Sequence, residues 1–501
     1  MSIRITGMNS GMDTDAMVQE LVKAYQEKGK SKTQTKTKHE WKQEIWTNLN
    51  KKIKSFSSKV SNLQYASSYN QKKTVSSDEN RVSVIAGDNA VRGTQTIKVA
   101  AMAKSSYITS GVLQKLDAEG KATGEKLTAD STLSDLGITS ENSTITINRN
   151  GESVKISANK DTTIGSFVKA LQESGVDASF DEKNGRLFIS AKESGAANNI
   201  EFDGDVTALQ KLKLGTENGA SVIAGQDAKI YLNGAEFTSS TNSFDINGMA
   251  INVKGLTDEE SDEEITLTTD TDTDAIYNNI KSLIKEYTSL INELSKLYNA
   301  DSAKGYNPLS DDEKDAMSDT EIEKWETKIK DSLLRRDNDV ASVMNAMKNS
   351  STKSYEVNGK SYSLSDFGIG TISYFISGDN EKSALHINGD EDDEHVSGEV
   401  NKLKQMITVD PDTVAGFFSK YMKDMADQFT KMTRSTTNRS YGNFFDDKKM
   451  KTDLTKYEKK ITEWEEYVAD IEDKYYKQFT NMEKQMASLN STQSQLGSYF
   501  G

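Results

Sequence analysis

The chain has 501 residues, of which 35% are apolar and 28% are charged, and its formal net charge is -15. This length exceeds what one hydrophobic core serves, so several domains are expected. The chain has no cysteine, which excludes disulfides, thiolate metal sites and cysteine nucleophiles. No stretch approaches the roughly 18 to 20 uninterrupted apolar residues of a membrane span, so membrane insertion is not expected.

The first helix is predicted directly after the glycine-punctuated opening SIRITGMNSGMD. Asp13 or Thr14 is the expected N-cap, and Asp15 stands in the first turn, where a carboxylate suits the helix dipole. A seam of apolar residues then begins along the helix. Its predicted first positions are Met17, Leu21 and Ala24.

Basic residues are concentrated in the first 75 residues, which hold fourteen Lys or Arg against six Asp or Glu. They alternate with small polar residues, and few aromatic side chains are present to stack on bases. The pattern therefore favours a solvated helix face, or an unfolded leader suited to secretion, over nucleic-acid binding.

A second seam, with alternating three- and four-residue spacing, follows and predicts a coiled-coil helix. It comprises Trp46, Leu49, Ile53, Phe56, Val60 and Leu63.

From about residue 76 to 275 the sequence changes to short β-branched runs separated by Gly and Asn, with one helix expected in TTIGSFVKALQESG. Five Asn-Gly pairs there favour primed turns and hence antiparallel hairpins. They are Asn150-Gly151, Asn184-Gly185, Asn218-Gly219, Asn233-Gly234 and Asn247-Gly248.

Helical periodicity returns at Asp274 and continues to Leu297, and a further helix is predicted from Asp319 to Met347. A short β interlude follows in SYEVNGKSYSL, GTISYFI and SALHING, and helices resume at about Val396. The last seam runs from Leu454 to Phe500. If the helical halves on either side of the β block pair, they lie side by side. Without an internal partner, the terminal seams are expected to stay disordered until another chain supplies a groove.

These elements predict a multidomain α plus β fold. It combines coiled-coil terminal helices and a helical-bundle domain with inserted antiparallel β-rich domains. The terminal helical assembly segments are predicted at residues 1–45 and 455–501. The helical domain is predicted at 46–75 and 276–454, with a β interlude near 354–390. The first β-rich domain is predicted at 76–110 and 226–275, and the second at 111–225.

Catalytic motifs are absent from the sequence. His39, His386 and His395 are the only histidines, and none stands in the spacing of a zinc helix or a catalytic triad. No glycine-rich phosphate loop or nucleophile elbow occurs. We therefore expect no enzyme activity and no cofactor.

One acidic loop, NGDEDDEHVSGE, approaches the register of a calcium loop. Asn388, Asp390, Asp392 and Glu399 fall at ligand positions, but Asp393 occupies the position of the turn glycine. A solvated loop is the alternative, and no metal site is predicted.

Four stretches carry a resemblance to a known family. GMNSGMDTDAMVQELV resembles the opening of the bacterial flagellar filament cap family, also called hook-associated protein 2. SGVDASFDEKNGRLFISAKESG is similar to the flagellin-type hairpin motif of its projecting domains, SLSDFGIG with ITVDPDTVAGFF to its helical-domain signature, and FTNMEKQMASLNSTQSQLGSYF to its C-terminal tail. The acidic insert YNPLSDDEKDAMSDTEIEKWE and residues 434–445 depart from the family pattern.

The resemblance implies a secreted structural protein, exported unfolded through the flagellar type III apparatus, that acts outside the cell at the flagellum tip. There it is expected to form a ring-like homo-oligomer, such as a pentamer, that promotes folding and insertion of flagellin. Hook-filament junction proteins and an export chaperone on the C-terminal tail are further implied partners. The absence of cysteine and the presence of only two prolines fit export, since they leave no disulfide to undo and few slow isomerisations.

The alternative is an extracellular coiled-coil adhesin that binds host mucus or glycans through its β-rich domains. On the favoured interpretation the terminal seams form the assembly interface. Its candidate residues are Met17, Leu21, Ala24, Met482, Met486, Leu489, Leu496 and Phe500.

Overall fold

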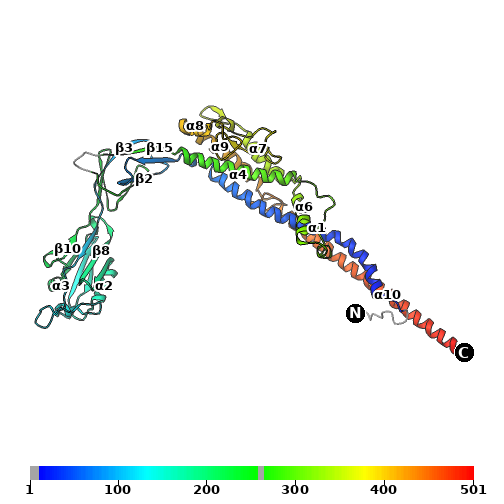
Figure 1. Ribbon diagram of the computed structural model, residues 1–501, viewed down its shortest axis with the longest axis horizontal. Helices are drawn as coiled ribbons and strands as arrows, with labels where there is room; N and C mark the ends of the chain where they lie inside the picture. The colour runs from blue at the N-terminus through cyan, green and yellow to red at the C-terminus, as the bar shows by residue number, and fades with distance from the viewer. Residues whose placement is uncertain (1–10, 258–263, 501) are drawn as a thin grey trace. The chain divides into compact units, whose positions relative to one another are not determined.

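The computed structural model describes residues 11–257 and 264–500, the latter without the side chains of the last two residues, and it divides into two compact units. One comprises the chain up to Asn70 and from Thr273 onward, and the other is Gln71–Asp272. The first is mainly helical and the second is built of antiparallel strands (Figure 1). The predicted multidomain α plus β fold is therefore confirmed. Gly7, Asn9 and Ser10 of the predicted flexible opening lie outside the described residues.

The helical unit consists of helices of very different lengths, with two small strand pairs between α7 and α8. Its helices are α1 Thr14–Asn62, α4 Thr273–Asn299, α5 Asp311–Asp315, α6 Asp319–Ser332, α7 Asn338–Thr352, α8 Lys402–Val409, α9 Pro411–Met432 and α10 Asp447–Phe500. Its strand pairs are β16 Tyr355–Val357 with β17 Lys360–Tyr362, and β18 Ile369–Gly370 with β19 His386–Ile387. Helix α1 continues across residues 45 and 46, and α10 continues across residues 454 and 455. The domain boundaries proposed at these two places stay predictions.

One hydrophobic core joins α1, α4, α7, α8 and α9. The three–four spacing predicted its contributors correctly, because side chains at this spacing share one face of a helix. The buried seam residues are Trp46, Leu49, Ile53, Phe56 and Val60 on α1, and Ile276, Ile280, Leu283, Tyr287, Leu290 and Leu294 on α4. The ring of Phe56 lies edge-on to Tyr287 and Phe429, with centroids 6.4 and 6.1 Å apart.

The single helix predicted from Asp319 to Met347 is wrong, because the chain forms two helices there. Between α6 and α7, Arg336 adopts a left-handed φ of 55°, which a continuous right-handed helix does not allow. The Asp337 carboxylate then accepts hydrogen bonds from the backbone N–H groups of Asp339 and Val340. This N-cap starts α7 as a separate helix.

The strand predicted in GTISYFI is also wrong. Only Gly370 of that run is in a strand, because β19, the partner of β18, has just two residues and supplies no further ladder hydrogen bonds. Tyr374, Phe375 and Ile376 are exposed on a turn instead.

The described residues of the β unit form two hydrophobic cores, and every strand pairing among them is antiparallel. The sheets have the strand orders β1-β15-β3-β11-β12, β13-β14-β2, β10-β4-β8-β7 and β6-β5-β9. The bounds are β1 Lys72–Ser76, β2 Val82–Ala86, β3 Gly93–Ala101, β4 Ser105–Thr109, β5 Thr144–Arg149, β6 Glu152–Ser157, β7 Val176–Asp181, β8 Arg186–Ser194, β9 Glu201–Gly204, β10 Ser221–Ile223, β11 Ala228–Leu232, β12 Ala235–Ser239, β13 Ser243–Ile246, β14 Met249–Val253 and β15 Ile265–Thr271.

Three of the five Asn-Gly pairs form the predicted two-residue hairpin turns, with positive φ at both residues. They are Asn150-Gly151, Asn233-Gly234 and Asn247-Gly248. Asn184-Gly185 lies in the longer β7–β8 connection, whereas the hairpin predicted at Asn218-Gly219 is wrong, because Gly219 ends a short 3-10 helix there.

The predicted helix in the β unit is confirmed as α2 Ile164–Glu173, capped by the Thr163 side chain. A second helix, α3 Val206–Lys211, was not predicted from the sequence. The Asp205 carboxylate caps it by accepting hydrogen bonds from the backbone N–H groups of Thr207 and Ala208. Asp at this position is a helix-start signal, but the six-residue helix is too short to display a periodicity.

Candidate assembly surface

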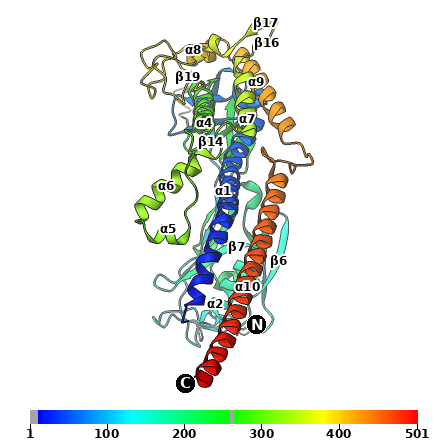
Figure 2. The same cartoon turned by 90° about the vertical axis from the view of Figure 1, so that its right-hand side faces the viewer.

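Helices α1 and α10 lie side by side and run in opposite directions (Figure 1, Figure 2). Trp46 in the last third of α1 stacks on Phe445, just before α10 begins, with centroids 5.3 Å apart and an interplanar angle of 9°. Further along the pair, Tyr25 meets Tyr467 edge-on at 6.2 Å. The predicted pairing of the helical halves is confirmed. The expectation that the terminal seams lack an internal partner is wrong, because each terminal helix packs against the other.

A glycine and a tryptophan bring the two helices into close contact. A Cβ on Gly29 of α1 would lie 2.6 Å from both Cδ1 and Nε1 of Trp464 on α10, so only glycine fits without movement of the ring. The indole N–H of Trp464 donates a hydrogen bond of 3.2 Å to the carbonyl oxygen of Tyr25. The ammonium of Lys32 lies 4.4 Å from the ring centroid, at the distance of a cation–π contact.

The first turns of α1 contact α10 through a stripe that differs from the predicted one. Val18 and Val22 are buried against Tyr476, whereas Met17 and Leu21 are 43% and 42% exposed. Ala24 is exposed as well. These three predicted seam positions therefore lie beside the stripe that is buried against α10, not within it. Their role in contacts between subunits stays a prediction.

The predicted start of α1 is confirmed. Asp13 is its N-cap and accepts a hydrogen bond of 3.0 Å from the backbone N–H of Ala16.

Periodicity alone does not choose between these two stripes, because both have three–four spacing. What decides is continuation along the helix. The stripe of Val18 and Val22 leads to Tyr25 and Gly29, which contact α10, while the stripe of Met17, Leu21 and Ala24 leads to the exposed Lys28.

The C-terminal candidates lie toward the end of α10, which extends beyond the start of α1 (Figure 1, Figure 2). Met482 and Met486 are half-buried. Leu489 and Leu496 are 67% and 53% exposed. The side chain of Phe500 lies outside the described residues. Leu21 and Met482 line one shallow hollow of about 200 Å³, together with Tyr475, Gln478 and Phe479, so the structure brings these two candidates together.

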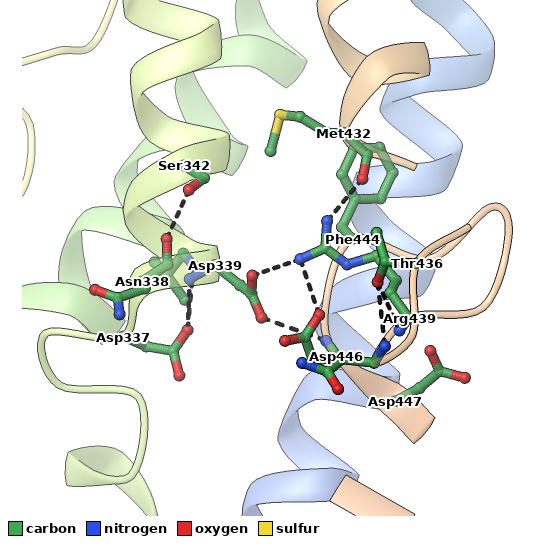
Figure 3. A network of polar contacts seen from close by, with 12 residues as sticks. Asp337, Asn338, Asp339, Ser342, Met432, Thr436, Arg439, Phe444, Asp446 and Asp447 are labelled. Atoms are coloured by element: carbon green, nitrogen blue, oxygen red, sulfur yellow. Dashed lines mark hydrogen bonds and ion pairs between the residues drawn. The ribbon is translucent and has the colours of Figure 1, made fainter. Parts of the chain in front are cut away.

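A loop that the sequence analysis left unassigned, residues 433–446, holds the beginning of α10 (Figure 3). The Arg439 guanidinium donates hydrogen bonds of 2.7 Å to a carboxylate oxygen of Asp339 on α7 and to the carbonyl oxygen of Met432. It also pairs with Asp446 at 3.3 Å. Burial raises the pKa of Asp339, and the charge of Arg439 opposes this shift. Phe444 and Phe445 enter the core, and this aromatic pair between polar residues is the sequence signal that was missed.

Several lysines of α1 form ion pairs rather than standing free in solvent as predicted. Lys30 pairs with Glu313 of α5 at 2.9 Å, and Lys42 pairs with Asp337, the N-cap of α7, at 2.8 Å. The basic excess of the first 75 residues is thus partly neutralised by acidic groups far along the chain.

The acidic loop that approaches calcium-loop register contacts a lysine. The Lys281 ammonium of α4 forms ion pairs with Asp390 and, at 2.7 Å, with Asp392. The ion pair and hydrogen bond from Lys281 lower the pKa of Asp392. An ammonium group therefore lies between two of the four carboxylate or amide side chains that calcium would use.

The two ends of the chain match one family. The models of the N-terminus and the C-terminus of flagellar hook-associated protein 2 match residues 10–106 and 225–491. The chain belongs to the flagellar hook-associated protein 2 family. The flagellar hook-associated protein 2 of Halalkalibacterium halodurans is 25% identical over 541 aligned residues, covering 99% of this chain and 100% of the relative. That of Thermotoga maritima is 27% identical over 53% of this chain and 40% of the relative.

A solved structure has a similar fold. The flagellar cap protein FliD D1-D2-D3 domains from Escherichia coli give a TM-score of 0.50 at 18% identity, covering 78% of this chain and 97% of the other. Among the helices of residues 11–257 and 264–500, none combines the length and the apolar composition of a membrane span.

Proposed function

We propose that this chain is the structural cap at the distal end of the bacterial flagellar filament, where it promotes folding and insertion of exported flagellin subunits. The observation that carries the proposal is the family match at both ends of the chain. The relative of similar fold from E. coli is described as a flagellar cap protein. The role is structural rather than catalytic.

The exposed apolar residues at the free end of the helix pair support assembly into a homo-oligomer. Met17 and Leu21 on α1, and Leu489 and Leu496 on α10, are partly exposed. Full burial of such a side chain contributes about 1.5 to 3 kcal/mol, so burying the exposed part of each in a subunit contact would contribute a share of that. A closed ring requires the same contact to repeat around an axis. A pentamer is the ring size that we propose.

Export and partners complete the proposal. The chain leaves the cell unfolded through the type III apparatus and acts extracellularly at the flagellum tip. Flagellin and the hook-filament junction proteins are its partners there. An export chaperone binds the C-terminal tail before secretion, and the exposure of Leu489 and Leu496 supports such a site.

A deletion strain tests the capping role. Without the protein we expect short or absent filaments and free flagellin in the medium. Expression of the intact chain restores filaments with capped tips in electron micrographs, whereas a chain lacking residues 455–501, expressed to the same level, does not. Filaments of normal length in the deletion strain, with no flagellin released, would contradict the proposal.

A further inference from the structure

Helix α1 presents two different faces between residues 29 and 41. One face, with Gly29 and Lys32, contacts α10. The other carries Lys30, Gln34 and Lys38, which are four residues apart and therefore lie above one another. This second face is covered by residues 301–328, here called the strap, which contain α5 and the first part of α6.

Polar contacts attach the strap to this face of α1. Lys30 pairs with Glu313 at 2.9 Å. The Gln34 side-chain amide donates to the carbonyl oxygen of Pro308 at 3.1 Å. The Lys38 ammonium donates to the carbonyl oxygen of Tyr306 at 3.0 Å and to the Asn307 side chain at 2.8 Å. The hydrogen bond from Lys30 lowers the pKa of Glu313, in keeping with a formed ion pair.

Little apolar burial holds the strap in place. The structure describes all of residues 301–328, and Pro308 is the one buried residue among them. The next residue, Ile329 in the last part of α6, is buried, so the strap ends where α6 is fixed to the rest of the helical unit. A hollow of about 1,110 Å³ lies between α6 and the end of α4, lined by Leu297 and Ala300 on one side and by Thr320 and Lys324 on the other. Figure 2 shows α5 and α6 to one side of α1 and α4. Segments with few buried apolar contacts open at low free-energy cost.

The strap is nevertheless well connected within itself. The rings of Tyr306 and Trp325 lie 4.5 Å apart, and the Trp325 indole N–H donates a 2.8 Å hydrogen bond to the carbonyl oxygen of Asn307. Capping boxes start both helices, at Ser310 with Glu313 and at Ser318 with Glu321. The strap is therefore built to move as one piece.

We propose that residues 301–328 form a releasable strap, which charge and hydrogen bonds hold on α1 and which opens without unfolding the helical core. Opening uncovers the face of α1 that carries Lys30, Gln34 and Lys38. The strap is independent of the capping role, because it concerns contacts within one chain.

Hydrogen exchange of the intact chain, followed by mass spectrometry, tests the strap at 0.05 and 1 M NaCl. High salt screens the ion pair, so amides of 303–328 are expected to exchange several-fold faster, while those of α4 between Ile280 and Leu294 are unchanged. Lys38→Met removes two hydrogen bonds from a charged donor, and we expect about tenfold faster strap exchange at low salt. Lys51→Met, on the same helix outside the strap contacts, is the matched control.

A charge swap separates the ion pair from general effects of substitution. Lys30→Glu and Glu313→Lys should each accelerate strap exchange, and the double variant should return it toward the original rate. The proposal is overturned if strap amides exchange at the rate of the α4 core in both salts, or if Lys38→Met and Lys51→Met have equal effects. The first result would mean that the strap opens only when the helical unit unfolds, and the second that the hydrogen bonds of Lys38 do not hold it on α1.

Discussion

Gly29 of α1 faces the indole of Trp464 on α10 so closely that a methyl group on Gly29 would come within 2.6 Å of two ring atoms. Ala normally stabilises a helix by about 1 kcal/mol relative to Gly. We expect the opposite for Gly29→Ala, because the ring must move and lose its hydrogen bond to Tyr25. The expected result is faster amide exchange in residues 20–35 and 455–475.

Gly497 supplies the control for that substitution. It also lies in a helix, but nothing stands within 4 Å of a Cβ built on it. Gly497→Ala should therefore leave the exchange of residues 455–475 unchanged. Slower exchange in the Gly29→Ala protein would show that the contact with Trp464 does not require glycine.

Sequence periodicity predicted those elements whose burial is set by local spacing. The seam from Trp46 to Val60 and the face of α4 are buried as expected, because three–four spacing places side chains on one face. The break before α7 was missed, because the left-handed Arg336 and the capping Asp337 interrupt a run that stays apolar on both sides.

Contacts between distant segments could not be predicted in the same way. The choice of Val22 over Leu21 for the contact with α10 depends on where the partner helix lies. The strap is attached by backbone carbonyl oxygens, by the Asn307 side chain and by one ion pair, and these contacts leave no periodic signal in the sequence. The loop with Arg439 joins α7 to the start of α10 across about a hundred residues, so its function as an anchor emerges only from the fold.

Substitutions at two adjacent residues of α1 should distinguish packing of α1 against α10 from assembly between subunits. Val22 is 3% exposed and Leu21 is 42% exposed. Val22→Asp places a charge in the contact with α10 and should cost at least about 1.5 kcal/mol, seen as faster exchange in α1 and α10. Leu21→Asp should change that exchange much less, because Leu21 only lines the rim of the contact beside Tyr475 and Met482, and it should lower the oligomeric mass measured by light scattering. An unchanged mass for Leu21→Asp would count against this stripe as an assembly surface.

Arg439 and Asp339 should contribute jointly, not independently, to the free energy of unfolding. Arg439→Met leaves the half-buried Asp339 carboxylate without its cation and is expected to cost about 2 kcal/mol of unfolding free energy. Urea titration followed by tryptophan fluorescence reports on this unit, because all four tryptophans lie in it. The double variant with Asp339→Asn should lose less than the sum of the single variants. Arg434→Met, an exposed position in the same loop, should have little effect.

The turn SLSDFG, residues 363–368, should stabilise the fold less at acidic pH than at neutral pH. Asp366 accepts hydrogen bonds of 2.7 Å from the backbone N–H and the hydroxyl of Ser363, and these lower its pKa, with burial opposing them. Because the folded-state pKa is lowered, the stabilisation is fully present above the ordinary pKa of about 4 and is lost as the pH falls through the lowered value. Asp366→Asn should therefore cost about 1 kcal/mol at pH 7.

That cost should shrink as the pH falls below about 4, since the carboxylate of the unsubstituted chain then takes up a proton. Urea midpoints from tryptophan fluorescence at pH 7, 5 and 3 measure the difference between the two proteins. Asp379→Asn, at an exposed position of the neighbouring turn, controls for the loss of one charge. A difference for Asp366→Asn that stays constant from pH 7 to 3 would show that the ionised carboxylate is not what stabilises the turn.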